Sequence, residues 1–287
     1  EIADHCQPAV PTPFTVEALM MRIGAIHFLN AEPLCGHLSR NDTRWQIVDS
    51  SPSELARSLR NGSIDVGLVP QVEACRRPDY RILEGHCISC LGEVASILLF
   101  HKKPWTSLQR VAVDQASNSS VALLQVLRHL DQLPPLEIIE TASNLSLLQQ
   151  DSTVDAVLLI GDAALKHRTR SPLDRIDLGM AWKQRTDLPF VFAVWLTRTQ
   201  LDPTVIEEVA RAAQLGIDQR PLFAAQFSKR YPDVLDEGAA RDYLQRCVRY
   251  QLGPPEKESI EVFHRLRAEI DPALDRQWQP RYYGETS

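Results

Sequence analysis

The chain has 287 residues, of which 44% are hydrophobic and 24% charged, and its formal net charge is −6. The length is enough for two ordinary domains of about 150 residues each. The negative charge provides no basic surface for a nucleic-acid backbone or an anionic membrane. The longest apolar runs, 94–100 and 156–160, are far shorter than the roughly 18 residues that cross a bilayer. We therefore expect a globular protein with a small-molecule partner, not a nucleic-acid or membrane protein.

Residues 1–21 precede the first expected strand. They include acidic residues and three prolines, but no Lys or Arg ahead of an apolar core, and so they lack the pattern of a secretory signal. We expect a poorly ordered N-terminal extension and a cytoplasmic protein.

The six cysteines are scattered, which is typical of reduced cytosolic thiols. Cys87 and Cys90 have the spacing of a redox or metal pair, but they lie in a strand-like stretch without a second pair. A structural role is the favoured interpretation, and we expect no metal site.

The first part of the chain alternates short apolar runs with helical patterns, which predicts βαβ units around a largely parallel sheet. Strands are expected at 23–29, 45–49 and 64–69. Between the last two, Ser51 and Glu54 have capping-box spacing around Pro52, and Asn61-Gly62 marks a helix end. These signals predict one helix between two strands.

The middle of the chain repeats this pattern after an interruption. Residues 88–100 are strand-like with a break at Gly92, and the polar stretch 101–109 contains Pro104, as a crossing between lobes would. Further strands are expected at 111–113, 136–139 and 156–160, and helices at 120–130 and 144–150. The apolar run 190–196 is interpreted as the return crossing, and only helices are expected after Pro203.

This order predicts a two-lobed α/β fold. Residues 22–110 and 190–287 would form lobe I, with a helical C-terminal part, and residues 111–189 would form lobe II. Small ligands bind between the lobes of such architectures, so the cleft is the expected site.

Two segments could bind an anion. Ser117, Asn118, Ser119 and Ser120 follow a strand and open a helix, where free N–H groups, hydroxyls and the helix dipole can converge on a carboxylate. Ordinary helix capping is the alternative. Gly161-Asp162 repeats the arrangement after the next strand, although an aspartate there is more often a helix cap than a general base.

Three isolated polar residues have open interpretations. Asn30 follows the first strand and directs its amide toward the cleft, or else it forms a turn. Ser96 lies in an apolar run, where a serine bonded to backbone is the common case. His27 is favoured as a core or edge residue rather than a pocket residue.

Five collinear segments resemble the chorismate dehydratase family, whose members act in menaquinone biosynthesis by the futalosine route. They are RIGAIHFLN followed by Pro33-Leu34, GSIDVGLVP followed by Glu73, LIGDAAL, LPFVFAVW and RYQLG, which begin at residues 22, 62, 159, 188 and 249. The resemblance runs from about residue 22 nearly to the end of the chain.

The resemblance implies a periplasmic-binding-protein-like fold of type II and the removal of water from chorismate, without a metal or organic cofactor. It also implies that Asn30 and Ser96 are the catalytic residues. Glu93 departs from the family, which often has proline there. The related 1,4-dihydroxy-6-naphthoate synthases typically have Ile-His-Glu where this chain has Ile160-Gly161-Asp162, which favours the dehydratase. A solute-binding protein without catalysis is the alternative from another class.

Overall fold

The computed structural model describes residues 20–114, 118–142 and 144–284. All but the last two residues of the expected N-terminal extension therefore lie outside the described part. The strands are β1 Met21–Ala25, β2 Trp45–Asp49, β3 Val66–Pro70, β4 Arg81–Cys90, β5 Ile97–His101, β6 Arg110–Val113, β7 Glu137–Glu140, β8 Ala156–Ile160, β9 Asp174–Asp177, β10 Phe190–Thr197 and β11 Arg249–Leu252. The helices are α1 Glu32–Cys35, α2 Pro52–Asn61, α3 Asn118–Leu130, α4 Leu147–Gln150, α5 Gly161–Arg168, α6 Leu178–Thr186, α7 Pro203–Asp218, α8 Arg220–Arg230, α9 Glu237–Asp242 and α10 Pro254–Ile270.

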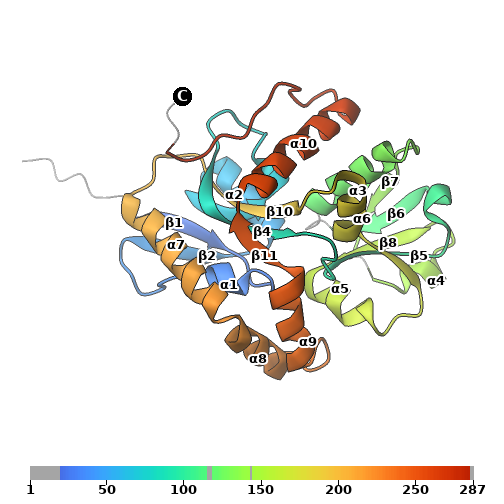
Figure 1. The fold of residues 1–287 in the computed structure, drawn as a ribbon, viewed down its shortest axis with the longest axis horizontal. Helices are drawn as coiled ribbons and strands as arrows, with labels where there is room; N and C mark the ends of the chain where they lie inside the picture. The colour runs from blue at the N-terminus through green and yellow to red at the C-terminus, as the bar shows by residue number, and fades with distance from the viewer. Residues whose placement is uncertain (1–19, 115–117, 143, 285–287) are drawn as a thin grey trace, which may run out of the picture.

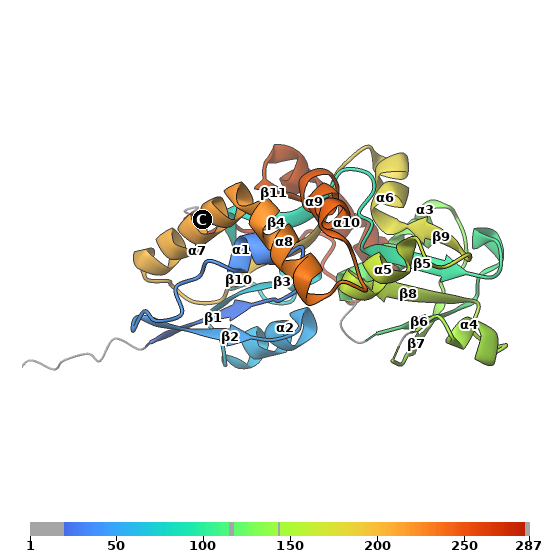
Figure 2. The same ribbon diagram turned by 90° about the horizontal axis from the view of Figure 1, so that it is seen from below.

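The strands form two separate sheets, each the centre of one lobe (Figure 1). The first sheet has the order β11-β4-β10-β3-β1-β2, and the second has the order β7-β6-β8-β5-β9. Figure 2 shows the two lobes side by side, with α7 and α8 over the first and α5 where the lobes meet. The predicted two-lobed α/β architecture is confirmed.

Helix α2 shows how closely local sequence signals can fix an element. The Ser51 hydroxyl accepts a hydrogen bond from the Glu54 amide, and the Glu54 carboxylate accepts one from the Ser51 amide, each at 3.3 Å. Gly62 ends the helix at φ +81°, which glycine adopts without steric cost. The buried side chains of Leu55 and Leu59 then pack this helix into the first lobe.

The first crossing between the lobes lies earlier than the sequence predicted. Ile97–His101 pairs with β8 and β9 of the second sheet, so it belongs to lobe II and not to the expected first lobe of 22–110. The chain crosses at 91–96, where Gly92 and Ala95 have positive φ values of +102° and +62°. These turns redirect one apolar run from one sheet into the other.

The return crossing is also shorter than expected. Phe190 already pairs with Cys90 of β4, so the apolar run 190–196 is a strand of the first sheet and not a connection. The chain returns at 187–189, beside the first crossing. Hydrophobicity alone does not distinguish a buried strand from a buried connection, because both have the same apolar composition.

Three further predictions were wrong in detail. Strand β1 ends at Ala25 and not at residue 29, which leaves Asn30 in a loop. β11 follows Pro203, where only helices were expected, and it closes the edge of the first sheet beside β4. The sheets are mixed, because β10 and β5 run antiparallel to their neighbours.

The lobes are joined by side chains as well as by backbone. Leu165 of α5 is buried in the core of the first lobe, and Phe263 of α10 is buried in that of the second. Lys166 of α5 pairs with Asp233, which follows α8 in the first lobe. Among the described residues, no helix has the length and apolar character needed to cross a membrane.

Candidate active site

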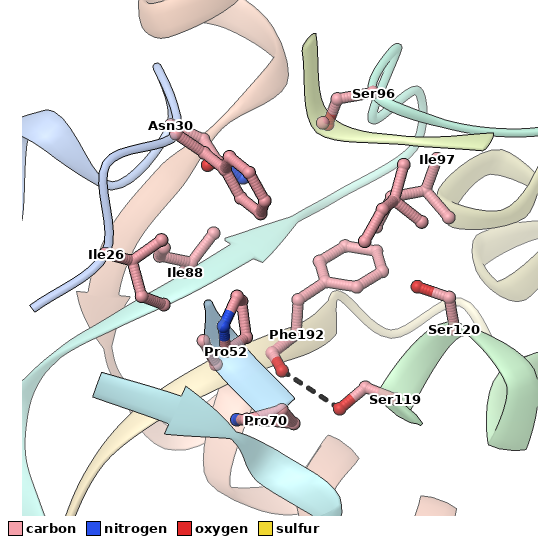
Figure 3. Close-up of a pocket in the computed structure, with 14 residues that line it drawn as sticks. Ile26, Asn30, Pro52, Pro70, Ile88, Ser96, Ile97, Ser119, Ser120 and Phe192 are labelled. Carbon is pink, nitrogen blue, oxygen red and sulfur yellow. Dashed lines mark hydrogen bonds between the residues drawn. The ribbon is translucent and has the colours of Figure 1, made fainter. Parts of the chain in front are cut away.

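A hollow lies between the two sheets, with a volume of about 550 Å³ counted to its open mouth (Figure 3). Most of its walls are apolar, and its polar groups are few. The first lobe contributes Ile26, Phe28, Asn30, Pro52, Pro70, Ile88, Phe192 and Ala193, and the second contributes Ser96, Ile97, Ser119, Ser120, Ile160 and Gly161.

Three helices begin at this pocket. Pro52 is the first residue of α2, Gly161 is the first residue of α5, and Ser119 and Ser120 lie in the first turn of α3. Helix N-termini carry unpaired N–H groups and partial positive charge. None of the described lining residues is Lys, Arg or His, so the helix ends supply the positive potential that an anionic ligand requires.

Asn30 lies in the turn between β1 and α1, on the first-lobe side of the pocket (Figure 3). Its amide can both donate and accept a hydrogen bond. This amide has no hydrogen-bond partner among the described residues, so its N–H donors and its carbonyl acceptor are available to a ligand. Asn30 thus lies in a turn, as the alternative interpretation predicted, but its side chain does not cap α1, which has no side-chain cap.

Ser96 lies in the first crossing, directly before β5, and is fully buried. Its backbone is fixed because the amide of Gly161 donates to its carbonyl at 2.7 Å. Its hydroxyl accepts a hydrogen bond from the Tyr243 hydroxyl at 2.8 Å. The predicted alternative, a serine hydroxyl bonded to backbone, is therefore not what the structure shows.

The serine-rich segment divides into residues with different positions. Ser119 and Ser120 line the pocket, but the Ser119 hydroxyl donates to the carbonyl of Phe192 at 3.1 Å and so joins α3 to β10. The Ser120 hydroxyl has no recorded partner among the described residues. Asn118 is exposed and does not line the pocket. Ser117 lies outside the described residues.

Gly161 lines the pocket with φ +59°, and a β-carbon there would meet the Phe28 ring at 3.6 Å. Asp162 is adjacent to the pocket without lining it. One of its carboxylate oxygens is buried and has no hydrogen-bond partner in the described part of the chain. Burial raises the pKa of Asp162 to about 6, opposed by the Leu29 amide and reinforced by nearby Glu32.

We expect this shift to make stability depend on pH. The pKa of Asp162 rises from an ordinary 3.8 to about 6 on folding. Between pH 3.8 and about 6, the carboxyl group is therefore protonated in the folded protein and ionised in the unfolded chain. The free energy of unfolding therefore falls as pH increases from about 4 to 6 and is lower by on the order of 3 kcal/mol above that window. Asp162→Asn should remove this slope in denaturant titrations at several pH values.

The matched control is Asp174→Asn, the same substitution at an exposed aspartate, measured in the same titrations. An Asp162→Asn variant with the slope of the unsubstituted protein would show that Asp162 titrates normally.

Sequence reasoning did not identify the apolar walls of the pocket. Phe192 was included in a buried run, and Pro52 was identified only as a helix start. Phe28 and Ile160 lie beside predicted site residues, which was the available signal. Hydrophobicity alone does not distinguish a wall residue from a core residue.

His27 and the paired cysteines have other surroundings. His27 is exposed and lies beside a second hollow, where its ring nitrogen is 2.8 Å from Asp49. Cys87 and Cys90 are fully buried in β4, and burial raises the pKa of Cys87 to about 12. The described residues include no cluster of three or more His, Cys, Asp or Glu side chains placed to hold a metal ion.

The solved structures similar to this chain have the fold of periplasmic binding proteins. A protein from Archaeoglobus fulgidus matches with a TM-score of 0.68 at 19% identity, over 88% of this chain and 98% of that one. The periplasmic aliphatic sulphonate binding protein of Escherichia coli matches with a TM-score of 0.60 at 16% identity, over 93% and 94% of the two chains. The fold is thus periplasmic-binding-protein-like, with its pocket between the lobes.

Sequence comparison identifies the family. A family model described as menaquinone biosynthesis matches residues 21–269, so the chain belongs to this family. A relative from Thermus thermophilus, named chorismate dehydratase, is 31% identical over 92% of this chain and 98% of its own length. A chorismate dehydratase from Campylobacter jejuni is 24% identical over 85% and 96%. The predicted family is confirmed.

Proposed function

We propose that this protein is a cytoplasmic chorismate dehydratase, which converts chorismate to 3-[(1-carboxyvinyl)oxy]benzoate in the futalosine route to menaquinone. The observation that carries the proposal is the pocket between the lobes, in which Asn30 and Ser96 meet the N-terminal ends of three helices. Chorismate is a dianion with an apolar ring. The combination of apolar walls, helix N-termini and two neutral hydrogen-bonding side chains suits such a ligand.

The reaction removes the ring hydroxyl and the hydrogen on the neighbouring ether-bearing carbon. The C–H electrons form the aromatic ring, and the C–O bond breaks, so that hydroxide and the proton leave together as water. There is no net oxidation or reduction. Because the ring becomes aromatic, the product is strongly favoured and the enzyme mainly has to orient the reacting groups.

Asn30 and Ser96 have the properties for this orienting role. Neither is a strong base, but the Asn30 amide can hold a carboxylate or hydroxyl of chorismate, and the Ser96 hydroxyl can donate to the departing hydroxyl or to a carboxylate. The proton acceptor is then the substrate's own enolpyruvyl carboxylate or a bound water. In both cases the protein positions the acceptor and does not itself take the proton.

The direct experiment is to incubate the purified protein with chorismate and to follow the products by ultraviolet absorbance and mass spectrometry. A product lighter than chorismate by one water, with the absorbance of a substituted benzoate, supports the proposal. Chorismate that remains bound but unchanged would identify a solute-binding protein.

Ser120 should contribute to binding more than Ser119. Its hydroxyl, at the N-terminus of α3, has no partner among the described residues, whereas the Ser119 hydroxyl already donates to the Phe192 carbonyl. Ser120→Ala should weaken binding of the dianionic product by about 1 kcal/mol, roughly a fivefold change in Kd. Calorimetric titration with the product avoids turnover during the measurement.

Ser119→Ala provides the matched comparison, since it changes a serine in the same helical turn. Equal affinities of Ser120→Ala and the unsubstituted protein would show that the N-terminal turn of α3 acts only as a helix start.

A further inference from the structure

The hydrogen bond between Tyr243 and Ser96 connects parts of the chain that are far apart in sequence. The Tyr243 hydroxyl lies 2.8 Å from the Ser96 hydroxyl, across a separation of 147 residues. Tyr243 is 2% exposed and Ser96 is 0% exposed. Because both side chains are buried, the bond is stronger than it would be in water, and it defines the geometry of both hydroxyl groups.

The backbone around Tyr243 has an unusual form. Residues Tyr243–Cys247 make a single π-helical turn directly after α9, and the Val248 amide bonds to the Tyr243 carbonyl five residues earlier. Such turns are rare and occur often at functional sites, because the extra residue redirects a side chain. Here the turn lies in the C-terminal part of the first lobe, and its first side chain reaches the crossing that carries Ser96.

The direction of the bond determines where the Ser96 proton can point. Tyr243 donates and Ser96 accepts, so one lone pair of the serine oxygen is occupied. Among the described residues no acceptor is recorded for the Ser96 proton, and Ser96 lines the pocket. Burial holds the pKa of Tyr243 above its ordinary value, so the tyrosine remains a donor throughout the physiological pH range.

We propose that Tyr243 is a positioning residue for the dehydration, which holds the Ser96 hydroxyl with its proton directed at the bound substrate. This inference rests on the proposed function and extends it to a residue outside the pocket lining. Tyr243 does not touch the substrate. It limits the rotation of the Ser96 hydroxyl, so that the donor is already in place when chorismate binds.

Tyr243→Phe tests the proposal because it removes only the hydroxyl and preserves the buried ring. We expect kcat for chorismate to fall about tenfold, with KM within about twofold, since the donor to the transition state is misplaced while the binding groups remain. In the background of Ser96→Ala the same change should have no further effect on kcat, because the group that Tyr243 positions is absent.

Tyr250→Phe is the matched control. Tyr250 is also buried, and its hydroxyl has no hydrogen-bond partner in the described part of the structure. Its removal should leave kcat unchanged. A general effect of losing a buried tyrosine hydroxyl would instead lower kcat in both variants.

The outcomes separate this inference from the proposed function. A Tyr243→Phe variant with unchanged kcat would overturn the positioning role while the unsubstituted protein still dehydrates chorismate. If Tyr243→Phe lowers kcat by the same factor in the Ser96→Ala background as in the unsubstituted protein, its effect is structural and independent of Ser96. That result would also overturn the positioning role. An unsubstituted protein that does not dehydrate chorismate would reject the proposed function, and the inference with it.

Discussion

Replacement of either Asn30 or Ser96 by alanine is expected to lower kcat for chorismate about a hundredfold or more, on the order of 3 kcal/mol of transition-state stabilisation. Both side chains line the pocket, and the Asn30 amide has no partner among the described residues. Their removal misplaces the reacting groups without leaving a cavity that destabilises the core. The melting temperature should change little for Asn30→Ala. Ser96→Ala should lower it modestly, because the buried Tyr243 hydroxyl loses its acceptor.

The control for this prediction is Ser89→Ala. Ser89 is a buried serine of β4 that does not line the pocket, so its loss should not affect turnover. Near-normal kcat in folded Asn30→Ala and Ser96→Ala variants would remove both residues from the mechanism.

The second large effect is expected at Asp177, the last residue of β9. Its half-buried carboxylate accepts hydrogen bonds from the backbone amides of Val94 at 3.1 Å, Ala95 at 2.7 Å and Met180 at 3.0 Å. It thereby holds the crossing in which Ala95 has a positive φ and Ser96 follows. Asp177→Ala leaves these three amides without their acceptor.

We expect Asp177→Ala to lower the free energy of unfolding by about 3 kcal/mol, since the amides of the buried residues Val94 and Ala95 lose their acceptor at roughly 1–3 kcal/mol each. Relief of the half-buried charge offsets part of the loss. The expected fall in kcat is about tenfold or more, because the support of Ser96 is lost. Chemical denaturation and steady-state kinetics on the same preparation measure both. Asp177→Asn retains one acceptor oxygen and should recover part of each.

Asp174→Ala is the control within the same strand, because Asp174 is exposed. Equal stability of the Asp177→Ala and Asp174→Ala variants would show that the carboxylate of Asp177 does not hold the crossing.

The local elements were predictable because their signals are local. The capping box of Ser51 and Glu54 and the left-handed Gly62 define α2 from neighbouring residues alone. The strands β2, β6 and β8 were found within about a residue of their observed bounds for a similar reason, since short apolar runs lie between turn residues.

The division into lobes was less predictable, because it depends on strand pairing. Ile97–His101 and Phe190–Thr197 are both apolar, and nothing in their composition specifies the sheet to which each belongs. In the turn between β4 and β5, an alanine and not a glycine adopts the positive φ at position 95. The sequence therefore gives no glycine signal for the turn at that position. Pairing between segments distant in sequence determines the boundary, and hydrophobic periodicity carries no information on it.

The candidate site was predictable where a family motif included it. Asn30 and Ser96 were selected by resemblance, since their residue types alone were equally consistent with turn and core roles. The Tyr243 hydroxyl and the Asp177 carboxylate reach the crossing from segments 147 and 83 residues away in sequence. No spacing pattern could have associated them with Ser96 before the fold was known.

The central claim is dehydration of chorismate, and the fate of a single hydrogen tests it most directly. Chorismate carrying deuterium on the ring carbon that bears the enolpyruvyl ether should give 3-[(1-carboxyvinyl)oxy]benzoate without deuterium, because the eliminated water takes that hydrogen. Mass spectrometry of the product after incubation with the unsubstituted protein measures this loss. Unchanged labelled chorismate, or release of pyruvate with a hydroxybenzoate that retains the deuterium, would contradict the account.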